Sequence, residues 1–280
     1  MELDRAEKPL LQLRKLLKTL PSNPAPNEVH ELRIRARKIE AVGAALKAAD
    51  AKRTKRLLKL IKPVRKAAGG VRDMDVLTGN LMHMPQNADH EGSNDSLIRL
   101  VEHLGTVRRK SVGHLLDAVN RQRRPARRSL KNYAKLVESV VKGKKPAPIE
   151  IARTLESADG SGSLASSLMT ELRKWPRLDA RNIHTFRLKV KELRYVLQLF
   201  PGADRGLVDS LGKVKDEIGD WHDWQQLLGI ARDVLDARKD KALLAEIDAS
   251  AKEKLAHALA GANALRCRYL KSAPARRKAS

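Results

Sequence analysis

The stretch IHTFRLKVKELRY, residues 183–195, carries two side-chain patterns that decide the fold. On a helix, each residue turns the chain by about 100°, so apolar residues at this spacing share one face. They are Ile183, Phe186, Val190 and Leu193 from the stretch itself and Leu197 just after it. A strip beside that face holds His184, Arg187, Lys191 and Arg194. The spacing predicts an amphipathic helix from about Asp179 to Phe200, with a basic strip along the edge of its buried face.

An earlier stretch, VHELRIRARKIE at residues 29–40, repeats both patterns. Its apolar face consists of Val29, Leu32, Ala36 and Ile39, and its strip consists of His30, Arg33 and Arg37. The strip residues precede His184, Arg187 and Lys191 by the same number of positions. The match ends at Glu40, where the later copy has Arg194. The chain therefore contains two helices of one design.

A basic strip at the edge of a buried face lies where neighbouring helices hold its side chains close together, which favours a binding groove. The plainer interpretation is that lysine and arginine stems simply cover the apolar face while their charges stay in water. For one helix the plainer interpretation is preferable. The repetition, with histidine in the same phase, favours the groove.

A second element is repeated in step with the first. The stretches GGVRDMDV, residues 69–76, and GDWHDWQQ, residues 219–226, align Gly69 with Gly219 and Asp73 with Asp223. The chain is therefore expected to contain two copies of one helical unit.

These residues resemble the CHAD family, the conserved histidine α-helical domain. The resemblance rests on His-x-x-Arg-x-x-x-basic, then a helix, then Gly-x-x-(Arg or His)-Asp, stated twice over nearly the whole chain. It implies an all-α fold of two four-helix bundles related by a pseudo-twofold axis, around a basic channel that binds inorganic polyphosphate without catalysis. Two positions depart from the family pattern: Glu40, where another basic residue is common, and His222, where arginine is common.

The amino-acid composition is typical of a helical protein that binds a polyanion. The 57 Lys and Arg against 33 Asp and Glu give a formal charge of +24, a self-repulsion that a highly negative partner would offset. Aromatic residues make up only 3% of the chain, which favours helices over strands. The one cysteine, Cys267, excludes an internal disulfide framework. We expect neither a secretory signal nor a membrane span, and hence a cytoplasmic location.

Local signals divide the chain into helices. We expect helices from Leu3 to Leu20, from an N-cap at Asn27, and from Lys52 to Ala68, the last with a kink or break at Pro63. A new helix should open at Arg72 after Gly69-Gly70, and further helices should cover Ser96 to Asn120 and the basic run that begins at Arg121. The boundary between the halves, residues 1–147 and 148–270, is expected in the Gly143–Pro148 region.

The second half should repeat this plan. We expect a helix to Trp175, the histidine helix, a helix to Gly219, another from Asp220 to Arg238, and a last helix to Leu270. Residues 271–280 are basic and lack apolar periodicity, so they should form a disordered tail. Trp221 and Trp224, three residues apart, are expected in the core.

The sequence offers little for catalysis. An acidic residue in a first helical turn favours capping, so we interpret Asp73 and Asp75 as structural and not as metal ligands. His83 and His90 are expected to be loop histidines. There is no phosphate-binding glycine loop, nucleophile elbow or metalloprotease motif, so we predict no enzyme activity, no cofactor and no metal.

Two functions fit a strongly basic helical chain. Arginine, lysine and histidine along a strip suit inorganic polyphosphate, a ligand that is all backbone; polyphosphate granules and polyphosphate-metabolising enzymes are further expected partners. The alternative is a nucleic-acid-associated protein, which the charge allows, although the chain has no recognised binding motif and few aromatics for base stacking.

The predicted polyphosphate ligands are the two strips together with one arginine from the repeated glycine element and one from the helix that follows it. They are His30, Arg33, Arg37, Arg72, Arg108, His184, Arg187, Lys191 and Arg194. If the histidines gain a proton on contact with phosphate, affinity should rise as the pH falls from about 8 to 6.

Overall fold

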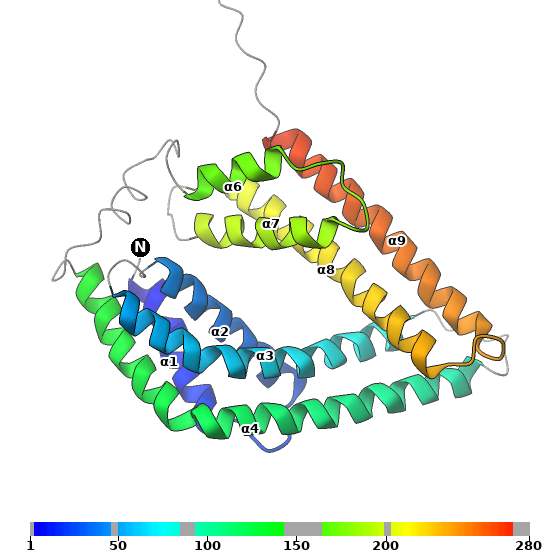
Figure 1. The fold of residues 1–280 in the computed structure, drawn as a ribbon, viewed down its shortest axis with the longest axis horizontal. Coiled ribbons are helices and arrows are strands. Elements are labelled where there is room, and N and C mark those ends of the chain that lie inside the picture. Colours follow the sequence, from blue (N-terminus) through cyan, green and yellow to red (C-terminus); the bar gives the residue numbers. More distant parts are fainter. Residues whose placement is uncertain (1–2, 46–49, 85–92, 143–163, 199–202, 271–280) are drawn as a thin grey trace, which may run out of the picture. The chain divides into compact units, whose positions relative to one another are not determined.

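The structure is a computed structural model that describes residues 3–45, 50–84, 93–142, 164–198 and 203–270. Within these ranges all regular structure is helical, which confirms the all-α class. The helices are α1 (Leu3–Thr19), α2 (Pro26–Ala45), α3 (Ala51–Met82), α4 (Ser93–Val141), α6 (Leu164–Arg173), α7 (Ile183–Leu197), α8 (Arg205–Val234) and α9 (Lys241–Leu265), followed by the π-helix η1 (Arg266–Leu270) (Figure 1).

The chain forms two compact units. Unit 1 comprises Met1–Arg153 together with Gly229–Leu244, and unit 2 comprises Thr154–Leu228 together with Ala245–Ser280. Helices α8 and α9 thus contribute to both. The predicted boundary after residue 147 and the predicted tail lie outside the described residues and stay predictions.

In unit 1 the four helices α1 to α4 enclose one core (Figure 1). Helix α1 packs against α2 and α4, and α3 packs against the same two helices. The apolar face predicted for α2 is fully covered, since Val29, Leu32, Ala36 and Ile39 are all buried. A buried hydrogen bond of 2.9 Å between the hydroxyls of Thr54 and Tyr133 joins α3 to α4. The predicted opening helix is confirmed.

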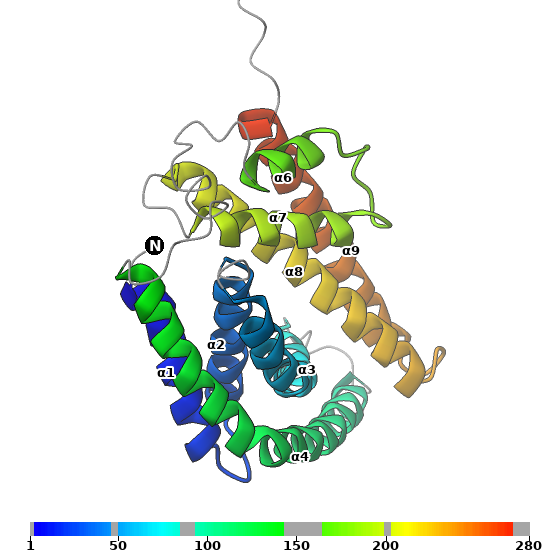
Figure 2. The ribbon, with the colours of Figure 1, turned by 60° about the vertical axis from the view of Figure 1, so that its left-hand side comes forward.

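In unit 2 the core gathers side chains from α6, α7, α8 and α9. The apolar face of α7 is buried at Ile183, Phe186, Val190 and Leu193. The Trp175 ring meets Phe186 edge-on, with ring centroids 5.6 Å apart. In both ribbon views α7 lies beside α8 (Figure 2). Trp221 and Trp224 are buried as predicted.

Three predicted helix ends are wrong, because long helices pass through them. Helix α3 runs uninterrupted through Pro63 and Gly69-Gly70, α4 runs through the basic run that contains Pro125, and α8 runs through Gly219. In α3 the buried positions continue at helical spacing on both sides of the glycines. Packing of that continuous face outweighs the roughly 1 kcal/mol that each glycine costs relative to alanine. Pro63 is exposed, so water can bond the carbonyl that it leaves unpaired.

The start of α2 also differs from the prediction. The helix begins at Pro26, so Asn27 lies inside it and is not the N-cap. The Glu28 carboxylate accepts a hydrogen bond of 2.8 Å from the backbone N–H of Ala25. Proline at the first helical position and a glutamate reaching back to the cap residue are both favourable there.

A buried aspartate joins the beginning of α4 to the connection between α8 and α9, all within unit 1. Asp240 Oδ1 accepts hydrogen bonds of 2.5 Å from Ser96 Oγ and from Arg99 Nη2. Its Oδ2 accepts a hydrogen bond of 2.7 Å from the backbone N–H of Asp236. One carboxylate thus fixes the turn and holds it against α4.

No helix in the described ranges is both long and apolar enough to cross a membrane.

Candidate anion-binding site

The basic strip of α2 lies at the edge of the unit 1 core. His30, Arg33 and Arg37 are half-buried, while the apolar residues beside them are fully buried. The strip therefore has the shoulder position that its sequence predicts. Helix α3 is the helix that faces it.

His30, Arg33 and Arg72 gather where α2 meets α3. A Cβ placed on Gly69 would lie 3.9 Å from Arg33 Nε, so the arginine passes close over the α3 backbone at a glycine. Burial lowers the pKa of His30, and the positive charge of Arg72 lowers it further. His30 is therefore neutral at pH 7, beside two arginines.

Glu40 has a partner that the sequence did not reveal. Its Oε1 accepts a hydrogen bond of 2.5 Å from Arg65 Nε on α3, in an ion pair whose side chains are each about a quarter exposed. This pair ends the cationic strip of α2. It explains how an acidic residue is accommodated where the second copy has Arg194.

Arg108, a predicted ligand, is engaged within unit 1. Its Nε donates to Asp75 Oδ1 at 2.6 Å, and its Nη2 donates to the backbone carbonyl of Pro24 at 3.0 Å. The Asp75 side chain is only 4% exposed, so the arginine neutralises a buried carboxylate. The prediction that Asp73 and Asp75 lie in the first turn of a new helix is wrong, since α3 is continuous there. Asp75 binds Arg108 instead.

In unit 2 the equivalent position holds a pair of imidazoles. The rings of His184 and His222 lie with centroids 4.3 Å apart. Burial lowers the pKa of His184, with Arg187 and Lys191 adding to the effect. Burial, then His184 and Arg187, lower the pKa of His222 to about 4. Among the described residues, no group hydrogen-bonds the buried Nδ1 of His184.

The arginines of α7 lie against the α8 backbone. Arg187 Nε donates a hydrogen bond of 3.0 Å to the backbone carbonyl of Lys215. A Cβ on Gly219 would overlap Arg187 Nη2, and a Cβ on Gly212 would lie 3.1 Å from Arg194 Nε. Both glycines are buried. The repeated motif indicates Gly219, but no pattern in the sequence indicates Gly212 or Lys215.

These contacts form one antiparallel register between α7 and α8. His184 meets His222, Arg187 meets Gly219, and Arg194 meets Gly212. In each pair the two residue numbers have the same sum, as they must when two helices run in opposite directions without a slip. The register brings the predicted strip of α7 onto a single face of α8.

Few acidic groups oppose these cations. Within the described part of the chain, no carboxylate lies within ion-pair distance of Arg33, Arg72 or Arg194. Lys215 pairs with Asp216 at 2.5 Å, but that carboxylate is 72% exposed and therefore weakly bound. Each unit thus offers half-buried cations beside neutral imidazoles, which is chemistry for an anion.

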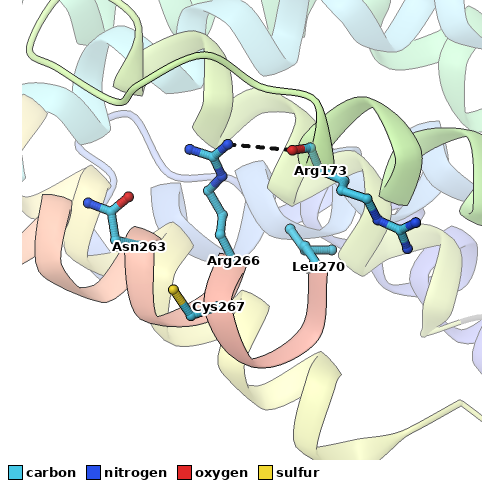
Figure 3. A pocket seen from close by; sticks show the side chains of 5 residues that line it. All are labelled: Arg173, Asn263, Arg266, Cys267 and Leu270. Atoms are coloured by element: carbon cyan, nitrogen blue, oxygen red, sulfur yellow. Dashed lines mark hydrogen bonds between the residues drawn. The ribbon is translucent and has the colours of Figure 1, made fainter. Parts of the chain in front are cut away.

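A separate cavity of about 310 Å³ lies at the end of unit 2 (Figure 3). It is lined by Arg173, Asn263, Arg266, Cys267 and Leu270. The Arg266 guanidinium donates to the backbone carbonyls of Arg173, Trp175 and Pro176. Arg173 is the last residue of α6, and the other two carbonyls follow it, so Arg266 supplies donors to the end of the helix and to the segment after it. The cavity contains none of the predicted ligands.

Of the two predicted loop histidines, His83 and His90, the structure describes only the first. The His83 ring bonds the carbonyl of Gly79 at 2.7 Å at the end of α3, and His90 lies outside the described residues. Across the described ranges, no three histidine, cysteine or acidic side chains gather in a way that would hold a metal ion.

Comparison with known families adds one finding. The family model for the CHAD domain matches residues 10–239, which include both histidine helices and both glycine elements. No curated protein and no solved structure matches the chain.

Proposed function

Because the chain belongs to the CHAD family, we propose that it binds inorganic polyphosphate, without turning it over, on the basic strips of α2 and α7 and the helices packed against them. The observation that carries the proposal is the α7–α8 register. It gathers Arg187, Lys191, Arg194 and two neutral imidazoles along one helix pair.

The residue types suit phosphate oxygens. Arginine presents paired N–H donors to phosphate, lysine adds a point charge, and neutral histidine still donates one hydrogen bond. From His184 to Arg194 the strip extends about 15 Å along the helix, at about 1.5 Å per residue. A strip of this length suits a linear ligand better than a single phosphate.

Binding without turnover belongs to the same proposal. Phosphoryl transfer needs carboxylates that hold a metal ion at the reacting phosphate. Two carboxylates next to the unit 1 strip, Glu40 and Asp75, are already paired with Arg65 and Arg108. Across the described ranges, no three histidine, cysteine or acidic side chains gather that could hold such a metal ion.

Nucleic acid is the rival ligand. A protein that binds single strands without sequence preference needs exposed aromatic side chains for base stacking. Trp221 and Trp224 are at most 7% exposed, so they serve the core. Polyphosphate, which has no bases, fits the site better. Association with polyphosphate granules or with polyphosphate-metabolising enzymes in the cytoplasm would follow from the same binding.

A competition experiment distinguishes polyphosphate from nucleic acid as the preferred ligand. We expect unlabelled polyphosphate to displace labelled polyphosphate far better than equal phosphate concentrations of duplex DNA or single-stranded RNA at one salt concentration. Equal displacement by DNA or RNA would favour the nucleic-acid alternative.

Paired substitutions then test the site. We expect Arg33→Ala with Arg187→Ala to weaken polyphosphate binding at least tenfold more than Arg124→Ala with Arg128→Ala, a loss of about 1.4 kcal/mol or more in binding free energy. The control pair also removes two charges, but both of its residues are exposed on α4. Equal losses would mean that net charge alone binds the polymer.

A further inference from the structure

Two glycines in the middle of α8 lie under arginines of α7. A Cβ on Gly219 would overlap Arg187 Nη2 and approach its Cζ to 3.1 Å. A Cβ on Gly212 would lie 3.1 Å from Arg194 Nε and 3.5 Å from its Cζ. At both positions the group that fills the space of a side chain is a guanidinium from another helix.

Among the glycines in the described helices, the approach of an arginine is closest at these two: a Cβ on Gly69 would lie 3.9 Å from Arg33 Nε, and a Cβ on Gly261 would meet the Glu217 carboxylate instead. A Cβ on Gly79, Gly113 or Gly229 would meet no atom within 4 Å. Glycine is among the least favourable residues inside a helix, so two of them buried at the centre of α8 weaken it unless something compensates. Close approach of the arginines is a compensation that only glycine permits.

Spacing places both contacts on one face. Gly212 and Gly219 are two helical turns apart, and so are Arg187 and Arg194. Between them, Arg187 Nε donates to the Lys215 carbonyl at 3.0 Å. The α8 backbone therefore fixes the direction of Arg187 by a hydrogen bond on one side and by contact with Gly219 on the other.

We propose that Gly212 and Gly219 are positioning residues for anion binding, because they let the guanidinium groups of Arg194 and Arg187 lie flat on the α8 backbone in fixed orientations. This inference rests on the proposed function. A held arginine loses less side-chain freedom when the ligand arrives, so more of the interaction energy appears as affinity.

Alanine at position 219 would displace the guanidinium of Arg187 and break its bond to the Lys215 carbonyl. We expect Gly219→Ala to weaken polyphosphate binding about fivefold to tenfold, the effect of releasing one ordered side chain. Gly212→Ala, where the contact is less close, should have a smaller effect in the same direction. Gly229→Ala, an exposed glycine of the same helix, should leave the affinity unchanged.

The decisive measurement is a double-mutant cycle. Polyphosphate affinity at one salt concentration and the unfolding temperature are measured for wild type, Gly219→Ala, Arg187→Ala and the double variant. If Gly219 acts through Arg187, Gly219→Ala costs no further affinity once Arg187 is alanine, and any fall in unfolding temperature that it causes in the wild-type background disappears. A purely structural glycine would keep its effect in both backgrounds.

Each result decides one question. Wild-type protein that fails to bind polyphosphate overturns the proposed function. Wild-type binding with equal affinity in Gly219→Ala overturns the inference and leaves the function standing. If Gly219→Ala alone does not fold, recovery of folding by Arg187→Ala supports the inference, whereas failure of the double variant to fold contradicts it.

Discussion

In unit 2, the histidines His184 and His222 are expected to make anion binding depend on pH. Burial lowers the pKa of both His184 and His222, the latter to about 4, so both rings are neutral at pH 7. A bound polyanion favours the protonated rings and raises both pKa values. Binding then takes up protons, and affinity must increase as the pH falls through the pKa values of the complex. The increase ends only below the pKa values of the free protein.

We therefore expect affinity for polyphosphate to rise as the pH falls from 8 to 5, and to go on rising below the ordinary imidazole pKa of about 6.5, because both pKa values of the free protein lie below it. For each pKa unit by which binding raises the pKa of one histidine, the affinity for polyphosphate increases by up to about tenfold. The measurement is a dissociation constant at fixed salt between pH 8 and 5. In His184→Gln with His222→Gln the rise should shrink, because glutamine donates but takes no proton. Equal pH profiles would contradict this role.

Replacing Arg108 is expected to lower the stability of the protein more than its affinity for polyphosphate. Its removal leaves the Asp75 carboxylate buried without its charged partner, which should lower the free energy of unfolding by about 3 kcal/mol. Because Arg108 already serves Asp75 and the Pro24 carbonyl, polyphosphate affinity should change less than in Arg187→Ala. Chemical denaturation measures the first effect, and adding Asp75→Ala should restore much of the loss. If a folded Arg108→Ala protein bound polyphosphate as weakly as Arg187→Ala does, Arg108 would be a polyphosphate ligand after all.

The sequence predicted the strip residues but not their partners. Periodicity places His30, Arg33 and Arg187 beside an apolar face, and all three are half-buried there. Arg65 and Gly212 stayed hidden because their roles depend on the register between two helices. A register is fixed by packing across the pair, and no local pattern within either helix contains it.

Among the elements, the connection between α8 and α9 depends on Asp240. The hydrogen bond from Ser96, with others from Asp236 and Arg99, keeps the pKa of Asp240 below its ordinary value. A lowered pKa means that the stabilisation is present above the unfolded-state value of about 4 and is lost as the pH falls through the folded-state value. The bonds hold α4 to the turn only while the carboxylate is charged.

Asp240→Asn should therefore lower the free energy of unfolding by about 1–3 kcal/mol near pH 7, since asparagine replaces a charged acceptor with a neutral one. Below the folded-state pKa of Asp240, which lies under about 4, the wild type also loses the charge, so the two proteins should become similar. Denaturant unfolding at several pH values measures the difference. A constant difference across the range would show that the charge of Asp240 contributes nothing.

The positions of helix ends were the weakest part of the sequence interpretation. Glycine signals predicted breaks at Gly69 and Gly219, and a proline signal predicted a kink or break at Pro63; the structure has continuous helices at all three positions, so the breaks are wrong. Their apolar faces continue at helical spacing through the break signals. That continuity was visible in the sequence, and it outweighs a local propensity whenever the face is buried.

For the whole molecule, we expect net charge to govern the proposed binding of polyphosphate. With a formal charge of +24, affinity for long polyphosphate should fall steeply with salt, because each neutralised phosphate releases condensed counterions. Triphosphate should bind much more weakly than the long polymer, since it meets few cations at once. Titrations at several salt concentrations with both ligands measure this. Equal affinities would contradict binding along an extended strip.

Composition and the repeated motifs predicted the all-α class and the family, because both depend on features spread over the chain. They did not predict that Gly229–Leu244 would belong with the first 153 residues in one unit. That grouping involves contacts such as Ser96 with Asp240, far apart in sequence. The pseudo-twofold channel predicted from the family stays a prediction.

Gly219 and Arg187 share one small volume, so a residue larger than glycine at position 219 requires Arg187 to move or to be replaced. The chain itself contains such a paired exchange. By the spacing of the repeated motifs, the counterparts of Gly212 and Arg194 in the first half are Lys62 and Glu40. Glycine and arginine have both been replaced there. Among relatives, arginine at the position of Arg187 or Arg194 should therefore co-vary with glycine across the helix pair, and both should disappear from the same sequences.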